Sequence, residues 1–374
     1  MAVTVHGTCE PPFAAVAEEL ERNLVERGEV GAAVAAYADG RLVVDLWAGL
    51  ADAPTGRPWA RDTIAHAYSV SKPFAATCLL LLVDRGVLSL DTPVCELWPA
   101  YGAHGKEGTL VRHVLTHQTG LVFLRDPLPP DALFDRERLA HALAAEEPLW
   151  PPGTHPAELA GLFGHLVGEL VLRADGRPLP RFLAEEVAGP WGLDFHVGLG
   201  PAELRRAATL LDEGGAWRRS IVDDPRPLLA PSLSNPPGIL EVDVVNSRPY
   251  RIAEIAAVNG HGTARAIARF YGGLAAGGIL DGVRLLRDET VAEMLRPQVV
   301  GRDRVLDDDV AWGLGLHADA GDGSFGRGGI GGFIGYGIRR AGLAAGFGYA
   351  TCALAGYERA EACADAFEGA LADR

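Results

Sequence analysis

Residues 74–86, FAATCLLLLVDRG, constrain the fold of this chain more than any other segment. Their spacing predicts a helix, and almost every side of that helix is apolar, so it has no face suited to water. Pro73 fits the first turn of such a helix, where its missing N–H costs no hydrogen bond, and Gly86 suits the position after the last turn. Because a helix of this kind needs other elements packed around it, we expect it to be buried.

Both ends of the chain carry signals of helix and strand together. Residues 12–28 place apolar side chains at helical spacing between charges, which predicts an amphipathic helix. Two apolar runs then flank Asp39-Gly40, a dipeptide typical of tight β-hairpins. Towards the other end, Thr263 is the expected N-cap of a further helix. Three strands and a closing helix are predicted after it, with the sequences AWGLGLHAD, FGRGGIGGFIGYGIRR, LAAGFGYATCALAG and ERAEACADAFEGALAD.

The middle of the chain differs, since residues 87–235 alternate short helical patterns with proline-rich loops. The order is therefore α/β, then α, then β and α, which a sheet interrupted by a helical insertion explains. We predict an α/β plus all-α fold: an antiparallel sheet flanked by helices, with an inserted helical domain. The α/β domain comprises residues 1–72 and 236–374, and the mainly helical domain comprises residues 73–235. The chain of 374 residues is long enough for two such domains.

Ser69 and Lys72 lie at the start of the predicted buried helix, in the segment YSVSKP. Residues three apart share one face of a helix, so the two side chains can touch. The helix N-terminus adds unpaired N–H groups and a positive dipole end, which favour an oxyanion beside Ser69. A lysine held in an apolar helix is expected to have a lowered pKa, so Lys72 can act as a base. The structural alternative is a serine that caps the helix and a lysine whose amine reaches solvent.

Composition excludes several classes of partner. The formal net charge is −15, which argues against nucleic acids and anionic membrane surfaces, because both attract clustered basic side chains. No apolar run is long enough to span a membrane, and the first residues lack the features of a signal peptide. We therefore expect a cytoplasmic protein. Its five cysteines, an odd number without a CxxC pair, are expected to be reduced and mostly buried.

Several segments resemble one known family. SVSKPFAA is followed by LLLLVDRGVLSLDTPVCELWP and VRHVLTHQTGL, and later by EIAAVNGHGTARAIARFYGGLAAGG and FGRGGIGGFIGYG. Together these segments resemble esterases related to class C enzymes, within the serine β-lactamase and penicillin-binding-protein superfamily. The resemblance implies an α/β domain beside an all-α domain, with the active site at their interface. It also implies that Ser69 is acylated and that Lys72, together with a tyrosine, handles its proton.

The tyrosine of the family's second motif is missing. In the family it follows a Pro-Gly-Thr turn, and the same count from Pro152-Gly153-Thr154 reaches Glu158 here. Three interpretations remain open. Glu158 is a general base with a raised pKa, or it pairs with Lys72 and keeps that lysine protonated, or it is an acid in the first turn of a helix. His155 and His165 are nearby alternatives for proton transfer.

The family's third motif is altered as well, because Arg327 stands where the family has Lys or His. Arginine keeps its proton, so Arg327 can bind a carboxylate or steady an anion but cannot donate a proton. Gly328 and Gly329 allow a substrate to approach the strand closely. The resemblance assigns the oxyanion site to the N–H groups of Ser69 and Ile330. A glycine-rich bend with a solvated arginine is the structural alternative.

One loop and one further histidine complete the set of candidate residues. By resemblance, the loop that contains Asn259 borders the cleft, so Asn259 is predicted to contact the substrate. His261 in the same loop either lines the cleft or has a role in a turn. His117 resembles a structural position of the family and is not expected to be catalytic.

Three functions fit these features. The first is an acyl-enzyme hydrolase or acyltransferase that acts on a small-molecule ester or amide in specialised metabolism, with Ser69 as nucleophile, Lys72 as base and Glu158 assisting. The second is a non-covalent biosynthetic cyclase or another non-hydrolytic enzyme on the same scaffold. The third is a catalytically inactive binding protein that retains the fold. No motif for a metal or an organic cofactor is present, and the sequence leaves the oligomeric state open.

Overall fold

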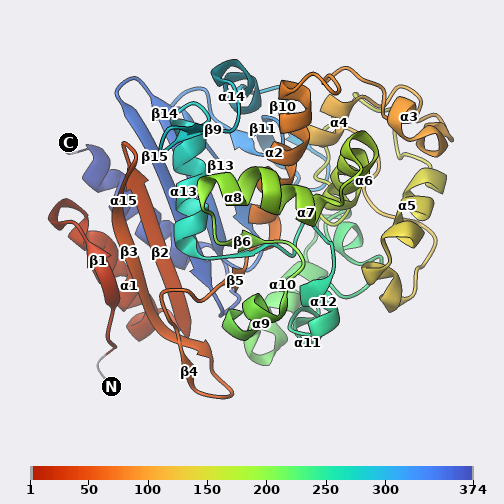
Figure 1. Ribbon diagram of the computed structural model, residues 1–374. Coiled ribbons are helices and arrows are strands. Elements are labelled where there is room, and N and C mark those ends of the chain that lie inside the picture. Colours follow the sequence, from red (N-terminus) through yellow and green to blue (C-terminus); the bar gives the residue numbers. More distant parts are fainter. Residues whose placement is uncertain (1–2, 373–374) are drawn as a thin grey trace.

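An antiparallel sheet takes its strands from both ends of the chain (Figure 1). In the computed structural model, which describes residues 3–372, the strand order is β1-β3-β2-β15-β14-β13-β12-β11-β10, and β4 pairs with β3. The fold class is therefore the one predicted: an antiparallel sheet with helices. The strands are β1 (His6–Cys9), β2 (Gly31–Ala38), β3 (Arg41–Asp52), β4 (Arg57–Pro58), β10 (Val299–Asp303), β11 (Asp308–Trp312), β12 (His317–Ala318), β13 (Ser324–Gly329), β14 (Phe333–Arg340) and β15 (Leu343–Thr351).

The hairpin between β2 and β3 forms at the predicted dipeptide. Asp39 and Gly40 have φ angles of 50° and 77°, and a positive φ at both central residues is what a two-residue turn of type I′ requires. Glycine adopts this conformation without steric cost, and aspartate tolerates it better than most residues. The turn sets the register of the hairpin, in which Ala38 lies opposite Arg41.

Two helices from opposite ends of the chain cover one face of the sheet (Figure 1). They are α1 (Ala14–Glu26) and α15 (Glu358–Ala372), and both helices were predicted. The helices pack against each other, and the rings of Phe13, Phe347 and Phe367 meet in the apolar cluster beneath them. Burial of these aromatic rings stabilises the junction between the two ends of the chain.

On the opposite face, α13 (Ala264–Ala275) packs directly on β15. Its N-cap is Thr263, as predicted, because Oγ1 of Thr263 accepts a hydrogen bond from the backbone N–H of Ala266 at 3.0 Å. A Cβ on Gly346 of β15 would lie 2.2 Å from the carbonyl oxygen of Ala268. Only glycine therefore permits the helix to approach the strand so closely.

The apolar helix is buried, as predicted, and lies between the sheet and the helical part (Figure 1). It is α2 (Ser71–Asp84), and its residues from Ser71 to Leu82 are all buried. It packs against α6 (Phe163–Asp175) of the helical part and also contacts β13. This helix therefore links the sheet to the helical part of the molecule.

The helical part continues further along the chain than residue 235. α11 (Val242–Val245) and α12 (Arg248–Ile252) extend it, and Figure 1 shows both beside α9 and α10. A three-stranded sheet, in the order β5-β7-β6, joins three separate segments of the chain. The other α-helices and β-strands are α3 (Val94–Leu97), α4 (Val111–Leu115), α5 (Arg136–Ala145), α7 (Leu179–Leu183), α8 (Gly189–Trp191), α9 (Pro201–Arg206), α10 (Ala216–Val222), α14 (Asp288–Leu295), β5 (Ala65–His66), β6 (Phe195–His196), β7 (His261–Gly262), β8 (Ile279–Leu280) and β9 (Val283–Arg284).

Two segments that were each predicted as one strand are divided. FGRGGIGGFIGYGIRR forms the hairpin β13–β14, because Gly331 and Gly332 adopt φ angles of 98° and 96° where the chain reverses. AWGLGLHAD contains the end of β11 and all of β12, with a turn between them in which Gly315 has a φ of 85°. Glycine is equally compatible with an extended strand and a left-handed turn, so its presence in the sequence did not distinguish the two.

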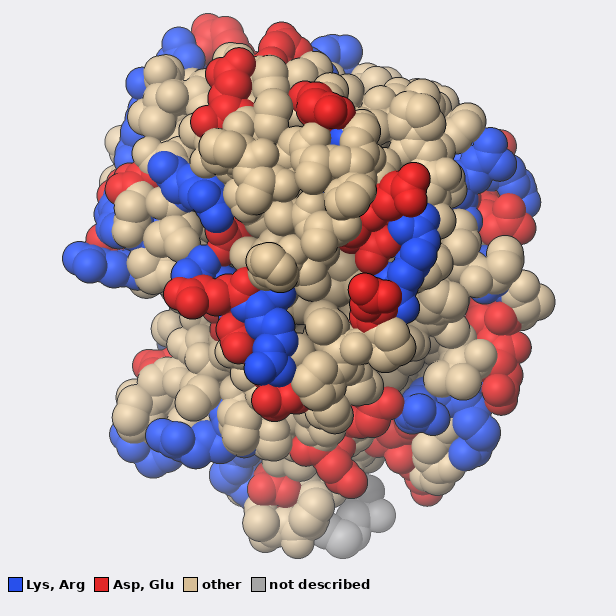
Figure 2. All heavy atoms as spheres, turned by 90° about the vertical axis from the view of Figure 1, so that its right-hand side faces the viewer, with Lys and Arg blue, Asp and Glu red and all other residues tan. Residues whose placement is uncertain are grey.

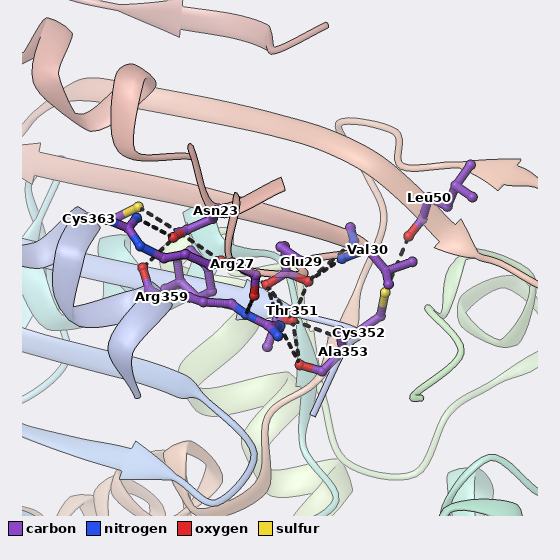
Figure 3. A network of polar contacts seen from close by, with 12 residues as sticks. Asn23, Arg27, Glu29, Val30, Leu50, Thr351, Cys352, Ala353, Arg359 and Cys363 are labelled. Carbon is purple, nitrogen blue, oxygen red and sulfur yellow. Dashed lines mark hydrogen bonds and ion pairs between the residues drawn. The ribbon is translucent and has the colours of Figure 1, made fainter. Parts of the chain in front are cut away.

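A buried carboxylate connects the first helix to the last strand and the last helix (Figure 3). Glu29 accepts hydrogen bonds at 2.9 Å from the hydroxyls of Tyr349 and Thr351 and from the backbone N–H of Val30. The guanidinium of Arg359 lies 3.4 Å away. Burial raises the pKa of Glu29, although Arg359 and the hydroxyl donors oppose that rise. Neutral donors and one cation therefore surround this carboxylate.

The outer face of the helical part carries charges of both signs, since Figure 2 shows basic and acidic side chains next to one another around an uncharged centre. Ion pairs account for such neighbours: Arg136 and Arg173, for example, both pair with Glu169. This face therefore lacks the one-signed basic patch that nucleic acid requires. Within residues 3–372, no helix combines the length and the apolar character needed to cross a bilayer. The five cysteines are free thiols, and three of them are buried.

Candidate active site

Ser69 lies in a 3₁₀ turn, Tyr68–Val70, that leads into α2. The backbone of Tyr68 has a φ of 42°, a conformation that costs a non-glycine residue free energy and persists only where the surroundings hold it. The ring of Tyr68 is held by packing against Trp217 and Phe333. This geometry leaves Ser69 7% exposed and places it in the wall of a cavity.

The amine of Lys72 reaches the hydroxyl of Ser69, as their spacing of three residues predicts. The distance from Nζ to Oγ is 2.8 Å. Nζ also donates to two carbonyl oxygens, those of Ala160 at 3.0 Å and Ala257 at 3.3 Å. The alternative of a lysine that reaches solvent is wrong, because Lys72 is 0% exposed.

Burial has a large effect on the protonation of Lys72. It lowers the pKa of Lys72 to about 7, and the positive charge of Arg327 contributes to the decrease while Glu158 opposes it. A base with a pKa close to neutral combines a substantial unprotonated fraction with a useful affinity for a proton. The amine is therefore suited to take the proton of Ser69.

Glu158 lies between two cations. Its Oε1 forms an ion pair with Nη2 of Arg327 and lies 3.5 Å from Nζ of Lys72. Burial alone would raise the pKa of Glu158, but Arg327 and Lys72 together hold that pKa well below its usual range. Such a weak proton acceptor is not a general base. Glu158 does pair with Lys72, as the second interpretation proposes, but it does not keep that lysine protonated, because the pKa of Lys72 is still lowered to about 7.

The interpretation of Glu158 as an acid in the first turn of a helix is wrong. Glu158 lies in a loop, and α6 begins at Phe163, five residues later. The helix dipole acts within the first turn, so it does not account for the carboxylate. The two neighbouring cations do.

β13 brings the third motif to the nucleophile. A Cβ on Gly329 would lie 2.6 Å from the carbonyl oxygen of Ala67 and 3.3 Å from the backbone nitrogen of Ser69, so glycine is required for this approach. Gly328 is similarly restricted, because a Cβ there would lie 3.0 Å from the ring of Tyr357. Ile330 follows in the turn after β13 and lines the same cavity as Ser69.

Arg327 is buried rather than solvated. Its side chain is 2% exposed, and its guanidinium carbon lies 4.6 Å from the centre of the ring of Trp312. A cation over an indole face is stabilised by the ring quadrupole, which is stronger where water is excluded. The alternative of a glycine-rich bend with a solvated arginine is therefore wrong.

The cavity at Ser69 has a volume of about 1020 Å³, and its wall includes Glu158, Arg327 and Ile330. This volume is at the upper end of the range for small-molecule sites, roughly 300–1,000 Å³. Further carboxylates also line it. Six of them have no ion-pair partner within residues 3–372: Asp308, Asp309, Asp319, Asp322, Glu361 and Glu368.

The prediction that Asn259 contacts the substrate is wrong. Its amide donates to the carbonyl oxygens of Tyr250 at 3.1 Å and Ala253 at 2.8 Å, and its Oδ1 accepts from the N–H of Ile255 at 3.1 Å. The residue is 0% exposed, so it has no polar atom left for a ligand. Its role is to fold the loop that presents the carbonyl of Ala257 to the active-site lysine.

The other candidate histidines are not placed at the reacting atoms. His261 is buried and its Nδ1 pairs with the carbonyl oxygen of Asn259 at 2.8 Å, while burial lowers the pKa of His261 to about 3. Burial likewise lowers the pKa of His165, on α6, to about 4. His155 packs edge-on against Trp150. None of these three belongs to the described wall of the cavity.

Sequence reasoning missed three residues near the site, which are Trp312, Asp303 and His317. Trp312 supports Arg327 from β11, and its Nε1–H donates to Asp303 at 3.1 Å. His317 stacks on the same indole and lines the cavity, and burial, reinforced by Arg327, lowers the pKa of His317 to about 4. These residues lie about 150 positions from Glu158 along the chain, and no local motif marked them.

Comparison with known proteins gives matches over most of the chain. The model of the family described as Beta-lactamase matches residues 17–363. The protein named Esterase/beta-lactamase LipL, from Mycobacterium tuberculosis (strain ATCC 25618 / H37Rv), is 36% identical over 344 residues, which are 89% of this chain and 80% of that protein.

Two solved structures are similar throughout. A family VIII carboxylesterase has a TM-score of 0.89 and 32% identity, with 98% of this chain and 100% of that chain covered. A penicillin-binding protein homologue from Caulobacter crescentus has a TM-score of 0.86 and 30% identity, with the same coverage of 98% and 100%. Ser69, Lys72, Glu158 and Arg327 all lie inside the matched residues 17–363.

Proposed function

The chain belongs to the Beta-lactamase family, and from this premise we propose that it is a serine esterase that works through an acyl-enzyme on Ser69. The observation that carries the proposal is the 2.8 Å contact between Oγ of Ser69 and Nζ of Lys72 in the wall of a large cavity. The relative named as an esterase/beta-lactamase and the structure titled as a carboxylesterase support an ester as the substrate.

Lys72 is the base in the acylation step. A neutral amine has two N–H groups, which match the carbonyl oxygens of Ala160 and Ala257, and one lone pair, which then faces Ser69. As Oγ bonds to the ester carbonyl carbon, its proton moves to Nζ. The leaving alcohol takes that proton when the C–O bond breaks, so the amine is neutral again.

Deacylation repeats the same transfers with water. The oxygen of water bonds to the acyl carbon while one of its protons moves to Nζ of Lys72. The bond between the acyl carbon and Oγ of Ser69 then breaks, and the proton returns to Oγ. An alcohol in place of water yields a new ester, so acyl transfer uses the same residues.

Glu158 stabilises the lysine as it gains the proton. Its carboxylate lies 3.5 Å from Nζ of Lys72, so it favours the ammonium that forms in each transition state. Arg327 keeps the proton from moving on to the carboxylate, because the ion pair holds the pKa of Glu158 well below its usual range. The backbone N–H groups of Ser69 and Ile330 are the proposed donors to the oxyanion.

The charge of the cavity favours neutral or cationic substrates. Six carboxylates without an ion-pair partner in residues 3–372 line the same cavity as Ser69, and a cleft lined by one sign of charge raises the local concentration of opposite charge. We expect an ester with a trimethylammonium group to have a higher kcat/KM than an otherwise matched ester with a carboxylate. The difference should shrink as salt is added.

Intact-protein mass spectrometry tests the nucleophile. Wild type should gain the mass of one adduct from a fluorophosphonate, and Ser69→Ala should gain none, whereas Ser89→Ala, an exposed serine outside the cavity, should be labelled like wild type. Ser69→Ala should also lose turnover of 4-nitrophenyl butyrate. Turnover that survives in Ser69→Ala would contradict the acyl-enzyme and favour the non-covalent enzyme, and a wild type without either signal would favour a binding protein.

A further inference from the structure

The backbone around Glu158 is held by two distant residues. The N–H of Ala157 donates to the carbonyl oxygen of His117 at 2.8 Å, and the N–H of Leu159 donates to Nδ1 of the same histidine at 3.0 Å. Between them, the N–H of Glu158 donates to Oδ1 of Asp303 at 3.1 Å. Because this segment is a loop, these three consecutive hydrogen bonds determine where the Glu158 carboxylate points.

His117 has an unusual conformation for such a contact. It is 0% exposed, its φ is 58°, and its ring lies 5.1 Å from the ring of Phe163 and 4.3 Å from that of Trp312. Since Nδ1 accepts a hydrogen bond, the proton of the neutral ring is on Nε2, which has no hydrogen-bond partner within residues 3–372. A left-handed residue with a buried unpaired donor costs free energy, which points to a role beyond packing.

Asp303 and Trp312 extend the same set of contacts to Arg327. Oδ1 of Asp303 accepts from the N–H of Glu158 and from two N–H groups of its own turn, and Oδ2 accepts the indole N–H of Trp312 at 3.1 Å. The face of that indole lies 4.6 Å from the guanidinium carbon of Arg327. One continuous set of contacts therefore holds both members of the Glu158–Arg327 ion pair.

We propose that His117 and Asp303 are positioning residues for Lys72, because they fix the segment whose Glu158 carboxylate and Ala160 carbonyl contact its amine. Nζ lies 3.5 Å from the carboxylate and 3.0 Å from the carbonyl, so a shift of this segment changes both contacts together. The charged and titratable groups that act on the amine are Glu158, Arg327 and the buried His117, while the half-buried His317 acts on Glu158 and Arg327. The inference rests on the proposed function, in which Lys72 is the base.

The main test compares His117→Phe with His117→Asn. Phenylalanine keeps the ring contacts but lacks the acceptor, whereas Oδ1 of asparagine replaces Nδ1 and asparagine tolerates a positive φ. For His117→Phe we expect kcat/KM for 4-nitrophenyl butyrate to fall about 100-fold, mainly through kcat. The pH midpoint of kcat should also move down by about one unit, because Glu158 no longer supports the protonated lysine. His117→Asn should restore most of kcat/KM and return the pH midpoint most of the way to its wild-type value.

His113 provides a matched control in the helix just before His117. Its Nδ1 accepts a hydrogen bond from the backbone N–H of Leu110 at 3.2 Å, so His113→Phe loses the same kind of contact outside the cavity wall. We expect its pH midpoint to equal that of wild type. An equal shift in both Phe variants would mean that loosening of the fold, rather than positioning, causes the effect, and would overturn the inference.

A measurement without turnover separates this inference from the proposed function. In protein labelled with ¹⁵N-histidine, His117 should show a protonated Nε2 and an unprotonated, hydrogen-bonded Nδ1 from pH 5 to 9, in wild type and in Ser69→Ala. A protonated Nδ1 overturns the inference whatever the activity. If this signature is present but the midpoint of His117→Phe is unchanged, the inference fails and the esterase proposal stands.

A second variant serves if His117→Phe does not fold. Asp303→Asn replaces a carboxylate oxygen with an NH₂ group, which cannot accept the indole N–H of Trp312. The pH midpoint of kcat should then shift in the same direction, and an unchanged midpoint overturns the inference.

Discussion

Glu29 and Glu158 are both buried carboxylates near an arginine, but their surroundings differ in kind. Glu29, in the scaffold, accepts from two hydroxyls and backbone N–H groups, and its arginine lies 3.4 Å away (Figure 3). Glu158, in the site, is in contact with two cations and accepts a hydrogen bond from no hydroxyl within residues 3–372. The pKa of the first is raised and that of the second is held well below its usual range.

The difference shows that burial alone does not determine the pKa of a carboxylate. Desolvation favours the neutral acid at both positions, so the outcome depends on whether dipoles or full charges surround the carboxylate. Hydroxyl and amide donors at Glu29 compensate desolvation only in part. Two cations at Glu158 outweigh it, which keeps a fixed negative charge beside Lys72.

The largest effect is expected from Glu158→Leu. It leaves Arg327 buried without its ion-pair partner, so the free energy of unfolding should fall by about 3–5 kcal/mol in urea denaturation. The double variant Glu158→Leu with Arg327→Met removes both charges and should recover most of that loss. If the double variant is as unstable as the single one, charge imbalance is not the cause.

A smaller effect is expected from Glu29→Ala. The change leaves the buried hydroxyls of Tyr349 and Thr351 without their acceptor, which should reduce the free energy of unfolding by about 2 kcal/mol. The rate of labelling of Ser69 by a fluorophosphonate should stay at the wild-type value, because Glu29 lies in the scaffold. A slower labelling rate would show that the two regions are coupled.

The pH dependence of stability should have opposite signs at the two residues. A raised pKa means that the folded state holds the proton of Glu29 more tightly, so its contribution is full below about pH 4.3 and is lost as pH rises through the folded pKa. A lowered pKa means that the contribution of Glu158 is present above about pH 4.3 and is lost as pH falls towards its folded pKa. In urea denaturation from pH 3 to 7, the free energy of unfolding of Glu29→Gln minus that of wild type should rise as pH increases above about 4.3. A difference that falls with pH would reverse the assignment.

The pH profile of turnover sharpens the same contrast at the lysine. Because the pKa of Lys72 is lowered to about 7, kcat for an ester should rise with pH through a midpoint near 7 as the amine loses its proton. Glu29→Gln should leave this midpoint unchanged. A midpoint close to the ordinary lysine value would contradict the assignment of Lys72 as the base.

The smallest effect is expected from Arg359→Gln. Its guanidinium lies 3.4 Å from Glu29, and the hydroxyl donors of Tyr349 and Thr351 remain in the variant, so loss of the ion pair should reduce the free energy of unfolding by about 1 kcal/mol in urea denaturation. A loss as large as that of Glu29→Ala would mean that the cation, rather than the hydroxyl donors, solvates the scaffold carboxylate.

Local spacing in the sequence was enough to predict the hairpin at Asp39-Gly40, the buried helix and the contact of Ser69 with Lys72. Each depends on residues close together in the chain, where backbone geometry fixes the distance. The ion pair of Glu158 with Arg327 was not predicted, although each residue was singled out separately. They are 169 positions apart, and only the packing of the loop on β13 brings them together.

Asn259 was singled out from the sequence, but its predicted role was wrong. Its side chain has the chemistry of a ligand contact, but a short loop without regular hydrogen bonds has backbone groups of its own to satisfy. The amide is used for three of them. A polar residue in a predicted cleft loop is therefore equally suited to hold the loop, and the sequence does not distinguish the two roles.

The pairing of β2 with β15 has a consequence for synthesis on the ribosome. β2 ends at Ala38 and its partner begins at Leu343, so one edge of the first hairpin stays unpaired while about 300 further residues are made. At a translation rate of roughly 5–20 residues per second, that edge is open for about 15–60 s. A nascent chain interrupted before Leu343 exposes a strand edge that can pair with other chains, so completion of the C-terminus also protects the N-terminus from aggregation.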